Sequence, residues 1–153
     1  SGMFKGALKL GDRTVASHGD SDLLLTSLDP SGKRLWTRTG GGPRVDYGLG
    51  IATDGAGNSF LTGEFTDTAE VAGASITSSG STEIYVAKFD RSGTLRWLTQ
   101  AGGDKGDNAY TIVADAQGNL YLSGNISGPS KFGPHSVTSA GGNDVYLAKL
   151  KAK

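Results

Sequence analysis

The chain has 153 residues, no cysteine, only four prolines and no net charge. Without cysteine it can form neither a disulfide framework nor a thiolate zinc site. Its 15 Lys and Arg residues balance 15 Asp and Glu residues, which argues against the basic surface that nucleic acid or an anionic membrane requires. No apolar run approaches the roughly 20 residues of a membrane helix. We therefore expect neither nucleic-acid binding nor membrane insertion.

Glycine is abundant, with 25 copies, and the sequence around it repeats. Positions 61 residues apart share glycine, tryptophan or an acidic residue: Gly19, Gly80 and Gly141; Trp36 and Trp97; Asp22, Glu83 and Asp144. A fixed period with several strand-like segments per repeat is typical of β-propellers and related arrays. We expect one all-β domain made of a partial unit at 1–39, a complete unit at 40–100, and a unit at 101–153 that lacks its last strand.

The complete unit predicts four antiparallel strands joined by tight turns. They cover residues 47–53, 59–65, 83–90 and 94–100. Equivalent strands are predicted at 1–4, 22–29 and 33–39, and at 108–115, 120–126 and 144–150. Residues 40–42 are interpreted as a glycine loop and residues 66–81 as a long, variable connection. No segment combines a 3.6-residue period with helix caps, so we predict no helix.

Two long segments carry a resemblance to a known family. GGPRVDYGLGIATDGAGNSFLTGEF and ITSSGSTEIYVAKFDRSGTLRW are similar to the bacterial β-propeller repeats called SBBP repeats, and the similarity extends over the whole chain. The resemblance implies four-stranded antiparallel blades, of which about two and a half are present. It also implies a secreted or envelope protein of bacteria, and it offers no agreed catalytic residues.

The number of blades predicts partners. A closed propeller has four to eight blades, so we expect the chain to be a C-terminal piece of a longer propeller or a subunit that assembles with copies of itself. Open blade faces and unpaired strand edges favour association. The expected partners are a second copy, neighbouring blades of a larger propeller, or a protein or glycan.

Candidate binding residues lie in the glycine loops before the first strand of a unit, because loops on rigid scaffolds often carry function. They are Arg44, Asp46, Tyr47, Asp104, Lys105, Asp107 and Asn108. In the third unit, Gly103, Asp104, Asp107 and Asn108 offer oxygen ligands that suit Ca²⁺, but no dedicated calcium-loop motif is present. The alternative is that Asp46 and Asp107 cap backbone amides. We predict no metal and no cofactor, with Ca²⁺ as the open alternative.

No catalytic constellation is visible. The acids before the third strand recur in every unit, which indicates a structural task such as pairing between blades. His18 and His135 break the repeat, but each is expected to be solvated and without a partner. Trp36 and Trp97 are interpreted as packing between blades or, alternatively, as stacking on sugars. The leading hypothesis is a non-enzymatic scaffold or binding module, followed by a lectin-like propeller and then by a propeller hydrolase or lyase.

Overall fold

The computed structural model describes residues 1–151 and confirms an all-β chain, with strands β1 to β16 and no helix in that range. Among the same residues there is consequently no helix long and apolar enough to cross a membrane. The first unit contains β1 (Gly2–Phe4), β4 (Asp22–Leu28) and β5 (Arg34–Gly41); the second contains β6 (Tyr47–Thr53), β7 (Ser59–Phe65), β10 (Glu83–Phe89) and β11 (Leu95–Gly103); the third contains β12 (Asn108–Ala114), β13 (Leu120–Ile126) and β16 (Asp144–Leu150).

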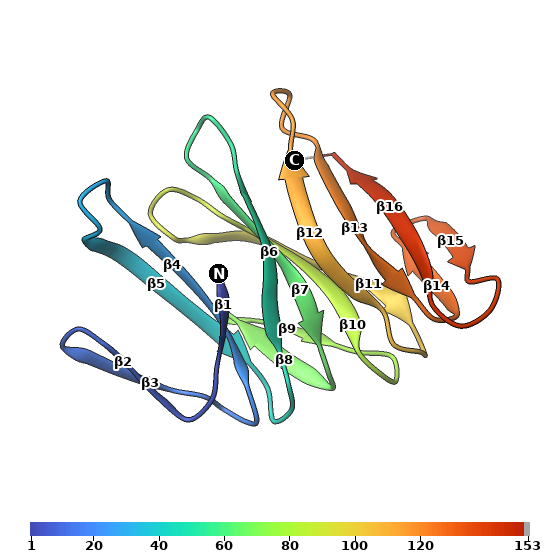
Figure 1. The fold of residues 1–153 in the computed structure, drawn as a ribbon, viewed down its shortest axis with the longest axis horizontal. Helices are drawn as coiled ribbons and strands as arrows, with labels where there is room; N and C mark the ends of the chain where they lie inside the picture. Colours follow the sequence, from blue (N-terminus) through green and yellow to red (C-terminus); the bar gives the residue numbers. More distant parts are fainter. Residues whose placement is uncertain (152–153) are drawn as a thin grey trace.

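Each unit is an antiparallel sheet whose strands lie in chain order. The second unit runs β6-β7-β10-β11, and the others run β1-β4-β5 and β12-β13-β16. The sheets follow one another across the molecule from the blue N-terminal end to the red C-terminal end (Figure 1). The predicted strands are therefore confirmed, to within three residues at their ends.

Three hairpins lie between the predicted strands. They are β2 (Ala7–Leu10) with β3 (Arg13–Ala16), β8 (Thr68–Val71) with β9 (Ala74–Thr77), and β14 (Pro129–Phe132) with β15 (His135–Thr138). The long connection predicted at 66–81 contains two strands, β8 and β9, that were not predicted. These strands are only four residues long, and the turn between β8 and β9 has positive φ at Ala72 and Gly73. Alanine is unusual at such a position, so the turn carries no clear sequence signal.

The hairpins connect neighbouring units. Strand β8 leaves its own unit and pairs with β5 of the first, placing Val71 opposite Gly40. In the same way β14 pairs with β11 of the second unit, placing Ser130 opposite Gly103. Within the described residues, β2 and β3 form a two-stranded sheet of their own. Each of the other two hairpins thus extends the sheet of the preceding unit.

This pairing corrects the interpretation of residues 40–42 as a loop. Gly40 and Gly41 are the last residues of β5, and the neighbouring chain passes too close for a side chain. A Cβ on Gly40 would lie 2.5 Å from the carbonyl oxygen of Glu70. A Cβ on Gly103, the equivalent position of Gly42, would lie 1.9 Å from the carbonyl oxygen of Pro129. Here glycine allows two backbones to approach closely.

Two apolar cores lie between the sheets. The first joins Leu23 and Leu25 of β4 to the second unit, and the second joins Ile84 and Val86 of β10 to the third unit. Strand β10 is buried on both faces, because Tyr85, Ala87 and Phe89 enter the first core while Ile84 and Val86 enter the second. A strand that is apolar on both faces suits a position covered on both sides. In the third unit, Val145 and Leu147 of β16 are exposed.

The Asp-containing turns between strands are structural. Asp54 Oδ1 accepts the backbone N–H of Ala56 at 3.0 Å and of Asn58 at 2.9 Å. Gly57 has a φ of +81°, which favours glycine. The same carboxylate contact, two residues along the chain, recurs at Asp29, Asp90 and Asp115.

Candidate functional site

The two glycine-rich loops lie on one edge of the stacked sheets, the lower edge in Figure 1, and the Asp turns lie on the opposite edge. Each loop is attached to the start of the preceding third strand. The backbone N–H of Asp46 donates to the carbonyl of Ser21 at 2.8 Å, and that of Asp107 donates to Thr82 at 2.9 Å. Their backbone is therefore held by the sheets.

The two loop aspartates are fully buried. Asp46 accepts the backbone N–H of Gly42 at 2.7 Å and of Thr66 at 3.2 Å. Asp107 accepts the equivalent N–H of Gly103, also at 2.7 Å. Burial raises the pKa of Asp46, and the backbone hydrogen bonds oppose that rise. Both side chains cap backbone amides, which is the alternative that competed with a calcium site.

A second set of acids begins the third strand of each unit. Asp22, Glu83 and Asp144 each accept the backbone N–H of the residue four positions earlier. Glu83 lies against Gly102, where a Cβ would be 2.9 Å both from its Cγ and from Asp107 Oδ2. Gly102 also has a φ of +143°. These acids therefore have a structural task, which is to order the loop before the third strand.

His18 has a partner, contrary to prediction. Its Nδ1 lies 2.8 Å from Asp22 Oδ2, with the ring 67% exposed and the aspartate fully buried. His18 and Asp22 are four residues apart in the sequence. This spacing suggests a side-chain contact mainly in a helix, and residues 18–22 are not helical. His135, on β15, is exposed and lines an apolar groove against β16.

The seven candidate loop residues do not form one cluster. Arg44, Asp104 and Lys105 are exposed. The Arg44 guanidinium forms an ion pair with Asp67 at 3.2 Å. The buried carboxylates of Asp46 and Asp107 face the loop interior, so the candidates fully exposed on the loop surface are Arg44, Asp104 and Lys105.

Tyr47 and Asn108 are partly buried and begin the first strands β6 and β12. Asn108 Nδ2 donates to Glu64 Oε2 across the boundary between the second and third units. Burial raises the pKa of Glu64, and the Asn108 hydrogen bond opposes this. The sequence interpretation missed Glu64, although the repeat offered a signal: its equivalents are Met3 and Asn125.

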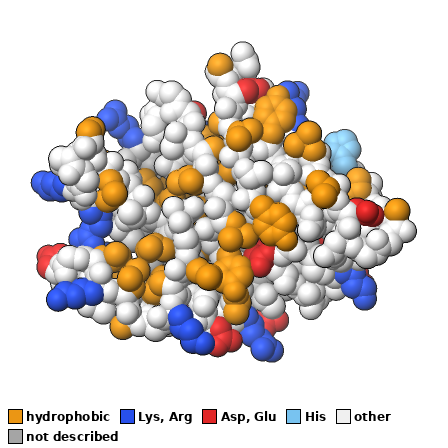
Figure 2. Space-filling view, viewed as in Figure 1, with side chains coloured by type: hydrophobic (Ala, Val, Ile, Leu, Met, Phe, Trp, Pro, Cys, Tyr) orange, Lys and Arg blue, Asp and Glu red, His pale blue; other side chains and the backbone are white. Residues whose placement is uncertain are grey.

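The first strands also carry an exposed apolar face. A bulge in β6 leaves Leu49 without a partner residue in β7, and an equivalent bulge in β12 does the same for Tyr110. Bulges redirect side chains, and these two are 41% and 51% exposed. Figure 2 shows hydrophobic side chains gathered over β6 and β12, with Lys and Arg mostly at the periphery.

This face, together with Glu64 and Asn108, is suited to contact with a partner that has both apolar and polar groups. Residues 1–151 contain no group of three or more His, Asp or Glu side chains that could share a metal ion.

Both tryptophans lie between sheets. Trp36 packs on Phe89 with ring centroids 6.4 Å apart, and its Nε1 donates to the carbonyl of Arg91 at 3.0 Å. The guanidinium of Arg38 lies 5.7 Å from the Trp36 ring centroid. Trp97 packs against the second core. This placement favours packing over sugar stacking.

No family model matches the chain. The chain is similar to Regulatory protein FlaEY of Caulobacter vibrioides, with 28% identity over 134 residues. The match covers 85% of this chain but 14% of that protein, so the chain spans only a small part of its curated relative.

Proposed function

We propose that this chain is part of a β-propeller and acts as a non-enzymatic scaffold or binding module, outside the cell or in the cell envelope. The observation that carries the proposal is a comparison of equivalent positions. Ile84 and Val86 are 1% and 5% exposed where the second unit meets the third, whereas their equivalents Val145 and Leu147 are 81% and 77% exposed. The open face of the third unit thus has the side chains that bury against another unit elsewhere in the chain.

The first strand of the second unit supports the same proposal. Ile112 is 3% exposed because it packs on the second unit, whereas its equivalent Ile51 is 43% exposed. Exposed apolar faces that repeat an internal interface are suited to bind a further unit. Radial stacking of such sheets is the arrangement of a propeller.

The non-enzymatic part of the proposal rests on how the acids are used. The two loop aspartates and the acids of the third strands all accept backbone amides. They recur from unit to unit, whereas a catalytic site normally needs one asymmetric set of groups. The exposed loop residues and the face over β6 and β12 are the proposed contact surfaces, since loops on a rigid scaffold often bind partners.

Association in solution tests the proposal. Sedimentation velocity between about 1 and 100 μM, the range of weak specific association, is expected to show a mass that increases with concentration. Val145→Lys with Leu147→Lys is expected to abolish this increase without lowering thermal stability, because both side chains are exposed. The matched control is Leu35→Lys, at an exposed position of β5 outside the proposed contact surfaces. A chain that stays monomeric at the highest concentration, with and without the substitutions, would refute the proposal.

A further inference from the structure

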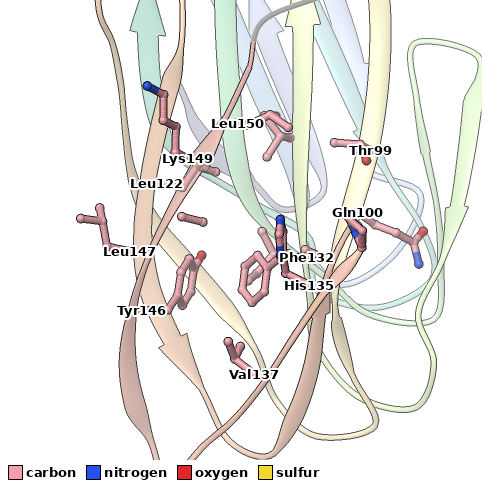
Figure 3. Close-up of a pocket in the computed structure, with 16 residues that line it drawn as sticks. Thr99, Gln100, Leu122, Phe132, His135, Val137, Tyr146, Leu147, Lys149 and Leu150 are labelled. Atoms are coloured by element: carbon pink, nitrogen blue, oxygen red, sulfur yellow. The ribbon is translucent and has the colours of Figure 1, made fainter.

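An apolar groove of about 490 Å³ lies between β16 and the β14–β15 hairpin (Figure 3). Its lining includes Ile84 and Val86 of β10, Phe132 of β14, Val137 of β15 and Tyr146 of β16. The rings of Phe132 and Tyr146 are 4.8 Å apart. Within the described residues β16 pairs only with β13, and β15 pairs only with β14. The groove is therefore bounded by two unpaired strand edges.

The second unit contains an earlier copy of this groove, and there it is filled. Five residues that line the groove are Phe132, Val137, Tyr146, Ala148 and Leu150. Their equivalents 61 positions earlier all belong to the first core, and they are Val71, Ile76, Tyr85, Ala87 and Phe89. Two leucines of β11, Leu95 and Leu98, pack against that core. Strand β11 also pairs with β10, the equivalent of β16. The occupant of the earlier copy is thus a fourth strand.

Polar contacts fix the end of that strand. Gln100 Nε2 donates to the carbonyl of Thr77 at 2.8 Å and to Glu83 Oε2 at 3.1 Å. The equivalents of these two acceptors, Thr138 and Asp144, lie at the ends of β15 and β16, the strands that border the groove. The third unit therefore repeats the acceptors as well as the apolar lining.

We propose that the groove binds one extended strand, antiparallel to β16, with the side-chain pattern of β11. That pattern is two leucines three residues apart, followed two residues later by glutamine, as at Leu95, Leu98 and Gln100. Backbone pairing with the free edge of β16 supplies affinity, and the pockets for the leucines supply specificity, as in other cases of strand addition. This proposal rests on the proposed function, because it treats the third unit as a sheet that takes a fourth strand.

Attaching the strand to the chain makes its local concentration high. A copy of residues 93–103 is joined directly after Lys153, which is 61 positions after Ser92, so that the spacing from β16 matches that of β11 from β10. The control chain carries the same tail with the copies of Leu95 and Leu98 changed to Asp. Hydrogen exchange of the β16 amides and the thermal midpoint are measured on both chains.

With the leucine tail, the free-edge amides of β16 are expected to exchange at least about tenfold more slowly than with the Asp tail, and the midpoint to rise. Equal exchange in the two chains overturns the proposal. Protection of another edge, such as that of β2 or β3, overturns it as well. Protection of β16 in the unextended chain that grows with concentration would show that a second copy occupies the groove instead.

The result separates this proposal from the scaffold proposal. The sedimentation experiment changes Val145 and Leu147, whose equivalents enter a different core from those of Tyr146 and Ala148. A tail that protects β16 in a chain that never associates would support the groove and not the scaffold. If the chain associates but neither tail slows hydrogen exchange of the β16 amides, the result would support the scaffold proposal and not the groove proposal.

Discussion

Replacing Ile84 with alanine tests whether neighbouring sheets stabilise one another. Ile84 is 1% exposed and lies in the core between the second and third units. Removing a buried isoleucine side chain down to Cβ typically costs about 2–5 kcal/mol, since transfer free energy is lost and a cavity remains. For a chain of this size, 1 kcal/mol corresponds to a change in midpoint of roughly 2–4 °C. We expect the midpoint to fall by about 6–12 °C for a cost of about 3 kcal/mol.

The repeat provides a matched control. Val145 occupies the position 61 residues later in β16 and is 81% exposed. Val145→Ala is expected to cost less than about 1 kcal/mol, mainly through strand propensity. Urea unfolding followed by circular dichroism measures both variants, at a protein concentration below any association. Similar losses in the two variants would show that the sheets do not rely on each other in this way.

Three further predictions use the same repeat. Gly63→Ala should destabilise the chain by more than about 2 kcal/mol in thermal unfolding, because a Cβ at position 63 would lie 1.8 Å from the carbonyl oxygen of Tyr47. Gly55→Ala should be close to neutral, because a Cβ at position 55 would have no atom within 4 Å. Tyr85→Phe should cost about 0.5–1.5 kcal/mol in urea unfolding, because the Tyr85 hydroxyl donates to the backbone carbonyl of Tyr47 at 2.9 Å. Tyr146→Phe should not be destabilising, since the buried Tyr146 hydroxyl has no partner among the described residues. Hydrogen bonds, above all from Asn119, lower the pKa of Asp115 in the folded chain. The unfolded chain therefore binds a proton at this carboxylate more readily than the folded chain does. The stability that the carboxylate contributes is complete above about pH 5 and is lost as the pH falls through the lowered pKa. The native chain should therefore lose more stability than Asp115→Ala between about pH 5 and pH 2, and parallel pH profiles would contradict this.

The sequence predicted the strands well because each has an unambiguous local pattern. Strand β10 is apolar on both faces, and the Asp turns combine an aspartate with a glycine at positive φ. The β8–β9 and β14–β15 hairpins were missed because the strands that they extend, β5 and β11, belong to another unit. The reason for glycine at position 40 is the backbone of Glu70, 30 residues further along the chain, and no local pattern shows such an approach.

The candidate site was harder to predict for a similar reason. The sequence placed Asp46 and Asp107 in the loops, but only the fold shows that backbone amides surround both carboxylates. The importance of Glu64 follows from its hydrogen bond with Asn108, which connects the second and third units in the folded chain. Side chains whose surroundings come from distant parts of the chain cannot be assessed from local composition.

The pairing of β8 with β5, and of β14 with β11, has a consequence for engineering. A cut at residue 40 would separate one sequence repeat from the next, yet it would also remove β8 and β9 from the sheet that they extend. Swapping a single repeat for a homologous one would therefore create two hybrid sheets at once. Grafting of individual modules should succeed only when each donor hairpin is accompanied by the Gly-Gly strand end onto which it docks.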